Sequence, residues 1–268
     1  MGTSALSPGA FLVRGLLVGL AAGLVAFAVA FLVGEPHVER AIELEEAAAS
    51  APHQHAHGED AHQDAHTHDG DEVVVTRGTQ RTWGLLTGNV AIGVALGGIV
   101  GLVAAVALGR IGRLAPRQST LTVCAVGFVA VALLPYLKYP PNPPGVGSAD
   151  TIDSRTASYF GFLLVSVLVA VLAVHLATRV WPTHGGYVAT LAGVATYLLV
   201  VVVAALLLPG VDEAGDFPAD TLWSFRVASL LTLAALWGTI GVGLTGLVGR
   251  LHDRAQADVE RRAFAASL

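Results

Sequence analysis

Six long apolar runs constrain this chain more than any other feature of its sequence. A helix that crosses the hydrocarbon core of a bilayer needs about 20 mostly apolar residues, and in lipid only helices and closed barrels satisfy every backbone amide. The runs cover residues 11–34, 83–108, 121–137, 157–178, 186–208 and 227–248. They predict an all-α integral membrane protein with about six transmembrane helices, of which 121–137 is the shortest.

The composition excludes several other classes of protein. Only 13% of the 268 residues are charged, against about a quarter in soluble domains. This excludes a nucleic-acid binder with a basic face, and the single cysteine, Cys124, excludes a disulfide framework. We expect Cys124 to be a buried apolar residue. The first run is too long for a signal peptide and lacks the usual basic start, so we expect a retained helix, with a signal peptide as the alternative.

The basic residues set the expected orientation. They gather in the segments that would follow the second, fourth and sixth helices, namely Arg110, Arg113 and Arg117, then Arg179, then Arg250, Arg254, Arg261 and Arg262. Loops rich in arginine stay in the cytoplasm, so both termini are expected inside. Residues 1–34 then form the first helix, 35–82 a loop outside, 83–249 the rest of the bundle, and 250–268 a cytoplasmic tail.

This orientation arranges the helices as three outward-opening hairpins. Each second helix begins in a similar way, at Arg81-Thr82, Arg155-Thr156 and Arg226-Val227. Such a pattern allows a threefold hairpin repeat about an axis along the membrane normal, as some transporters have. The alternative is that arginine and small residues are common at helix ends.

Glycines recur every four residues on the first two runs. Gly15, Gly19 and Gly23 form one stripe, and Asn89, Gly93, Gly97, Gly101 and Ala105 form the other. Small residues on one face let helix backbones approach closely in lipid, so both stripes are predicted to be packing surfaces. Asn89 needs a polar partner, either as an interhelical hydrogen bond or as a ligand on a transport pathway.

The segment 35–82 contains seven of the ten histidines. Its dense part, which we call the histidine tract, offers imidazoles and carboxylates as ligands, and the candidate metal-binding residues are His53, His55, His57, His62, His66, His68, Asp60, Asp64 and Asp69. Imidazole suits cobalt, nickel, zinc and copper(II), and irregular spacing favours capture and release over a closed structural site. The alternatives are a solvated spacer and a pH sensor.

The other two outer loops hold the remaining candidates. Prolines stiffen the first of them, 138–156, and the second, 209–226, is acidic and aromatic. Candidates for a pathway or gate are Asn89, Lys138, Asn142, Asp150, Asp153, Arg155, Asp216, Asp220 and Arg226, together with Thr87. Each arginine could instead anchor a helix end at the membrane interface.

These same loops resemble the CbtA family of prokaryotes, whose members are predicted to be cobalt transporter subunits. The resemblance rests on Lys138-Tyr139-Pro140, Asn142-Pro143-Pro144, Thr151-Ile152, Arg155-Thr156, Asp216-Phe217-Pro218, Leu222-Trp223 and Phe225-Arg226. The hydrophobic layout and the histidine tract match as well. The resemblance implies a protein of the cytoplasmic (inner) membrane that takes up cobalt for cobalamin synthesis. It also implies a small single-helix, CbtB-like partner that carries its own histidines.

The leading interpretation is therefore a membrane protein for uptake of a divalent transition metal, cobalt(II) first and nickel or zinc as alternatives. The chain has no P-loop, no H-E-x-x-H and no G-x-S-x-G, which argues against ATP hydrolysis by that route and against an intramembrane enzyme. A metal sensor or binding scaffold that does not transport is the alternative. No tightly bound cofactor and no nucleic-acid partner are expected. The expected surroundings are the lipid bilayer, and the pattern allows a homo-oligomer.

Overall fold

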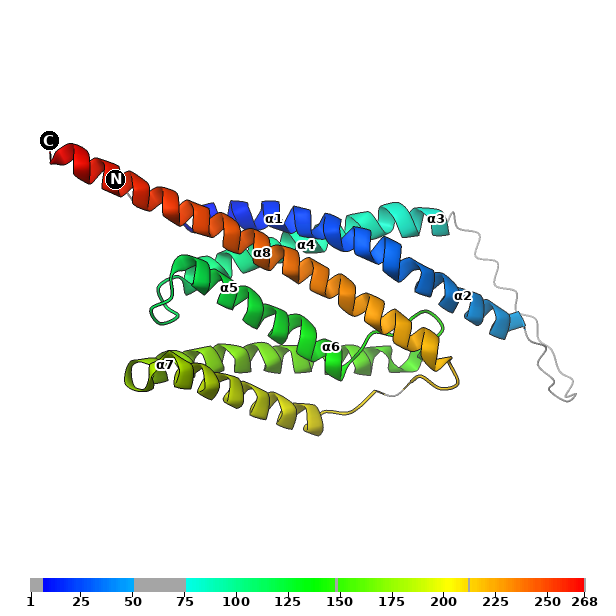
Figure 1. Ribbon diagram of the computed structural model, residues 1–268. Coiled ribbons are helices and arrows are strands. Elements are labelled where there is room, and N and C mark those ends of the chain that lie inside the picture. The colour runs from blue at the N-terminus through cyan, green and yellow to red at the C-terminus, as the bar shows by residue number, and fades with distance from the viewer. Residues whose placement is uncertain (1–6, 51–75, 148, 212, 268) are drawn as a thin grey trace, which may run out of the picture.

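The computed structural model describes residues 7–50, 76–147, 149–211 and 213–267, and these ranges contain helices and connecting loops but no strand (Figure 1). Five helical segments are long and apolar enough to cross a membrane: Pro8–Ser50, Arg77–Ala107, Pro116–Lys138, Ile152–Leu207 and Ala219–Ala266. Large apolar side chains face outward, and Leu206, Leu207 and Val242 each expose about four-fifths of their surface. Such a surface belongs in hydrocarbon, so the prediction of a helical membrane protein is confirmed.

One of these helices turns back on itself. α7 (Ile152–Leu207) has 56 residues, but Gly185 has φ 77° and ψ 169°, a conformation open almost only to glycine. The chain reverses there, and the two arms of α7 lie side by side (Figure 1). A Cβ atom built on Gly193 of the second arm would lie 3.1 Å from the carbonyl oxygen of Ala173 on the first. The apolar runs 157–178 and 186–208 are these two arms.

The glycine stripes form the tightest helix contact in the molecule. α1 (Pro8–Val29) packs along α4 (Leu85–Ala107), backbone against backbone. A Cβ atom built on Gly19 would lie 2.2 Å from the carbonyl oxygen of Gly93, and one on Gly97 would lie 2.3 Å from that of Gly15. The prediction that the stripes are packing surfaces is confirmed, and we call this contact the glycine seam.

Both helices of the seam continue beyond the apolar runs. α1 passes through a π-helical turn (Ala30–Gly34) into α2 (Glu35–Ser50), and α3 (Arg77–Thr79) passes through another (Gln80–Gly84) into α4. Both ends of the segment 35–82, expected to be a loop, are therefore helical. α2 is rich in alanine and glutamate, which favour helix without needing lipid. α8 (Ala219–Ala266) likewise extends through most of the expected tail.

The buried apolar residues form two separate cores. The first joins α1, α4 and α8 to α5 (Pro116–Gly127), and it includes Phe11, Cys124 and Ile240. Cys124 is 3% exposed, so the prediction for it is confirmed. The second core joins the two arms of α7 to the π-helical turn Phe128–Leu133, through residues such as Phe162 and Tyr197.

The hairpins are not packed alike. α1 packs on α4, the second arm of α7 packs on the first, and α8 packs on α1 and α5 rather than extensively on α7. Three equivalent hairpins and a threefold repeat are therefore not confirmed. The start of α1, the end of α8 and the turn of α7 lie at one end of the molecule, and α2 and α3 lie at the other (Figure 1). We call the end that carries α2 and α3 the α2–α3 end.

Candidate functional site

The histidine tract lies outside the described residues. This applies to every predicted metal ligand: His53, His55, His57, His62, His66, His68, Asp60, Asp64 and Asp69. In the parts of the chain that the structure does describe, no three histidine, cysteine or acidic side chains gather in a way that could hold a metal ion. The candidate site is therefore built from the helices and loops at the α2–α3 end.

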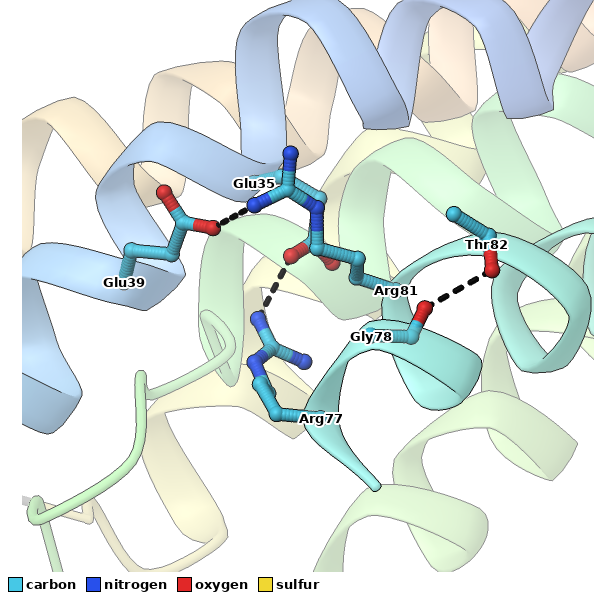
Figure 2. Close-up of polar contacts among 6 residues, drawn as sticks. All are labelled: Glu35, Glu39, Arg77, Gly78, Arg81 and Thr82. Carbon is cyan, nitrogen blue, oxygen red and sulfur yellow. Dashed lines mark hydrogen bonds and ion pairs between the residues drawn. The ribbon is translucent and has the colours of Figure 1, made fainter. Parts of the chain in front are cut away.

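Two ion pairs join the helices on either side of the tract. Arg77 Nη2 lies 2.5 Å from Glu35 Oε2, and the Arg81 guanidinium pairs with the carboxylate of Glu39 (Figure 2). Glu35 and Glu39 are four residues apart on one face of α2, and so are the two arginines on the facing helix. We call these four residues the α2–α3 clamp.

The clamp is partly shielded from water, which gives it structural weight. The Glu35 side chain is only 10% exposed, and the Arg81 guanidinium also lies 5.5 Å from the ring centroid of Phe31. Surface ion pairs contribute little to stability, but removing one partner from a buried pair leaves a costly uncompensated charge. The clamp therefore fixes α2 against the start of the α3–α4 segment, and its carboxylates are occupied by guanidinium groups.

A polar cavity of about 430 Å³ lies beside the proline-rich loop. Three predicted pathway residues line it: Asn142 from the loop, Arg155 from the start of α7, and Arg226 from α8. Arg226 donates from Nη2 to Asn142 Oδ1 at 3.0 Å and from Nε to the carbonyl oxygen of Pro141 at 3.4 Å. The fold thus brings together residues more than 80 positions apart.

Glu213 organises the other wall and was missed by sequence reasoning. Its carboxylate lies 2.7 Å from Arg155 Nη1 and accepts a hydrogen bond from the Thr151 hydroxyl. Nothing in the sequence distinguishes Glu213 from Asp212 or Asp216 beside it. Its side chain is 14% exposed, whereas Asp216 is on the surface.

The remaining predicted pathway residues do not converge on this cavity. Lys138 donates from Nζ to the carbonyl oxygen of Leu208 at 3.1 Å, which ties the end of α6 (Leu134–Lys138) to the end of α7. The four aspartates of the prediction are all exposed, and they are Asp150, Asp153, Asp216 and Asp220. None of them lines the cavity.

Within the membrane-spanning part, polar side chains are few. Asn89 donates to the carbonyl oxygen of Leu85 at 2.8 Å, on its own helix, so it makes no interhelical hydrogen bond among the described residues. Thr87 likewise bonds to carbonyl oxygens of its own helix. Sequence reasoning missed Ser166, a buried residue of α7 that donates to the carbonyl oxygen of Ala130 at 2.8 Å and contacts the Tyr197 hydroxyl at 2.8 Å.

Long apolar helices, a glycine seam and polar groups concentrated at the helix ends define a multi-pass helical membrane protein. The ion pairs of the α2–α3 clamp and the polar cavity are its main polar features, and neither indicates a catalytic centre.

The chain belongs to the CbtA family. The family described as probable cobalt transporter subunit (CbtA) matches residues 9–249, a range that includes the bundle and the histidine tract. The protein is therefore a membrane protein of a cobalt transporter-subunit family, which is not a family of enzymes. No curated protein and no solved structure gives a significant match to the chain.

Proposed function

We propose that this chain is the membrane component through which cells take up cobalt(II), and that its histidine tract captures the ion outside. The family match carries the proposal, because it names cobalt transport and extends across the tract and the bundle together. Following the resemblance, the proposed destination of the metal is cobalamin synthesis, and the proposed partner is a small single-helix, CbtB-like protein with histidines. Nickel and zinc are the alternative ions.

The proposed topology has six crossings with both termini in the cytoplasm. Each arm of α7 is long enough to cross, and the reversal at Gly185 supports counting them separately. A membrane-impermeant maleimide tests this, because the native Cys124 is buried and gives little background. Ser154→Cys should be labelled in intact cells, and Thr183→Cys only after the membrane is permeabilised. The opposite labelling pattern would mean the opposite orientation. Equal labelling of both sites would mean that the first arm of α7 does not cross the membrane.

The membrane potential is sufficient to drive such uptake. Moving one charge inward is worth about 2.3 kcal/mol per 100 mV, so a divalent ion gains about 4.6 kcal/mol. This corresponds to roughly a thousandfold accumulation at equilibrium. No ATP-hydrolysing motif is needed for transport in this direction.

The capture role follows from where the charges lie. Seventeen of the 20 acidic residues are in the three segments proposed to be outside, which attracts cations to that face. The α2–α3 clamp neutralises Glu35 and Glu39, so these two do not compete with the tract for metal. The exposed aspartates Asp150, Asp153, Asp216 and Asp220 are proposed to conduct the ion toward the bundle.

Uptake of labelled cobalt, nickel and zinc tests the proposal, in cells that express the chain with and without the CbtB-like partner. Replacing the six histidines of the tract by glutamine should raise the cobalt concentration needed for half-maximal uptake and leave the maximal rate unchanged. A triple variant at His175, His184 and His252 removes imidazoles elsewhere in the chain and should behave like wild type.

Three results separate this proposal from its alternatives. Uptake no higher than in empty cells, with or without the partner, would favour the metal sensor or scaffold. Normal half-saturation in the six-histidine variant would remove the capture role and leave transport intact. Equal uptake of all three metals would remove the preference for cobalt.

A further inference from the structure

Arg226 carries a positive charge that no described side chain neutralises. Its guanidinium is half-buried and donates to a carbonyl oxygen and to an amide oxygen, both uncharged. The ion pairs among the described residues involve Arg40, Arg77, Arg81, Arg155 and Arg261. A partly buried cation is costly without a counter-charge, and a bound anion would supply one.

Asn142 adds hydrogen-bond donors beside this charge. A guanidinium has only donors, so the Asn142 atom that it contacts must be the oxygen. The two N–H groups of Asn142 Nδ2 are then left over, and they have no hydrogen-bond partner among the described residues. Asn142 and Arg226 both line the polar cavity, and Arg155 lines its other side. The cavity is therefore rich in hydrogen-bond donors, and Arg226 gives it a positive charge, whereas Arg155 is paired with Glu213. Among the described residues, no carboxylate is part of its lining.

The remaining walls indicate an anion that also has a carbon skeleton. Ile152, Phe160 and Val211 provide apolar surface, and Tyr139 and Tyr159 provide aromatic rings. The volume of about 430 Å³ falls within the range of small-molecule sites and exceeds the need of a bare inorganic ion. Arginine recognises planar carboxylates through paired hydrogen bonds.

We propose that this cavity binds a small organic carboxylate. The ligand places a carboxylate against Arg226 and the Asn142 amide, and its carbon chain against the apolar wall. The carboxylate can arrive as the free acid or as part of a metal chelate, and the same chemistry recognises both. The positive charge of Arg226 repels a bare divalent cation, so the cavity is a different site from the histidine tract.

Calorimetric titration of the purified full-length protein with citrate tests the proposal directly. Asn142→Asp is the most informative variant, because it keeps the oxygen that Arg226 contacts, removes the Nδ2 donors and supplies the missing negative charge internally. Charge-assisted hydrogen bonds are worth about 10-fold to 100-fold in affinity, so citrate binding should weaken by at least about tenfold. Arg226→Gln should weaken it similarly. Ala219→Asp adds the same charge at an exposed position outside the cavity and should bind citrate like wild type.

Several results would overturn the proposal. These are no citrate binding by the wild type, unchanged binding by a folded Asn142→Asp variant, or phosphate binding as tightly as citrate. Parallel titrations with citrate alone and with its cobalt complex identify the source of the carboxylate, since tighter binding of the complex indicates a chelate. All readouts are binding constants of purified protein, so the outcome does not depend on whether the chain transports cobalt.

Discussion

Adding a single methyl group to the glycine seam tests the packing of α1 on α4. In Gly19→Ala the new Cβ atom would lie 2.2 Å from the carbonyl oxygen of Gly93 and 3.0 Å from the Cα atom of Val94. Ordinary contact begins at 3.4 Å, and the obstructing atoms are backbone, which cannot rotate away as a side chain can. The two helices must therefore separate locally by more than 1 Å.

The cost of this separation follows from the packing it removes. A gap of 0.5–1 Å forfeits about a quarter to a half of each van der Waals contact, and overpacking typically costs about 1–3 kcal/mol. Because the seam is the closest contact in the bundle, we expect a loss near the upper end, about 2–3 kcal/mol. At roughly 2–4 °C per kcal/mol for a chain of this size, the unfolding midpoint should fall by about 5–10 °C.

Cys124 provides the assay. It is the only cysteine and is 3% exposed, so a fluorogenic maleimide reacts with it only when the bundle opens. Gly88→Ala is the matched control, since Gly88 lies on α4, the helix against which Gly19 packs, and a Cβ atom there would have nothing within 4 Å. Alanine favours helix over glycine by about 0.5–1 kcal/mol, so this variant should be as stable as wild type or more so. Equal melting shifts for the two variants would refute the close approach of the backbones.

The same reaction of Cys124 with maleimide checks three further predictions. Arg77→Gln leaves the Glu35 carboxylate, 10% exposed, without its ion pair and should cost about 2 kcal/mol, most of which Glu35→Gln should restore in the double variant. Gly185→Ala forces a side chain into φ 77° and ψ 169° and should cost about 1–3 kcal/mol. Ser166→Ala removes the hydrogen bond to the carbonyl oxygen of Ala130 and should cost about 1 kcal/mol.

Each of these variants has a control of the same chemistry. Arg40 belongs to an exposed ion pair on α2, so Arg40→Gln should change stability by less than about 0.5 kcal/mol. A Cβ atom on Gly161, in α7, would meet nothing within 4 Å, so Gly161→Ala should not destabilise. Within the described part of the chain, Ser229 bonds only to the carbonyl oxygen of Phe225 on its own helix, and Ser229→Ala should be nearly neutral. A control that loses as much stability as its partner would contradict the reason given for that partner.

Local sequence patterns predicted the elements that depend on local physics. Hydrocarbon thickness sets the length of an apolar run, so every run became a helix or an arm of one. The glycine stripes were predictable because a spacing of four residues places small side chains on one face of each helix. The exact position of the reversal in α7 was not predictable, because Gly185 is followed by Gly186 and the sequence does not distinguish between the two glycines.

The contacts at the α2–α3 end could not be predicted in the same way. Arg77 and Glu35 are 42 residues apart, and Arg226 and Asn142 are 84 apart. No period or spacing encodes such pairs, because they form only after the helices have packed. The helical extension in α2 was more accessible, because its alanines and glutamates favour helix outside the membrane.

The glycine seam also determines which parts of the bundle can move. Backbone atoms that touch cannot move aside by changing rotamer, so the close contacts of Gly15, Gly19 and Gly93 hold α1 and α4 in one relative position. The two arms of α7 belong to a separate core, joined to the rest through the segment that follows α5. The seam and the α7 pair are therefore two separately packed bodies, and a displacement of one relative to the other would be taken up by that segment and by the loop between α7 and α8.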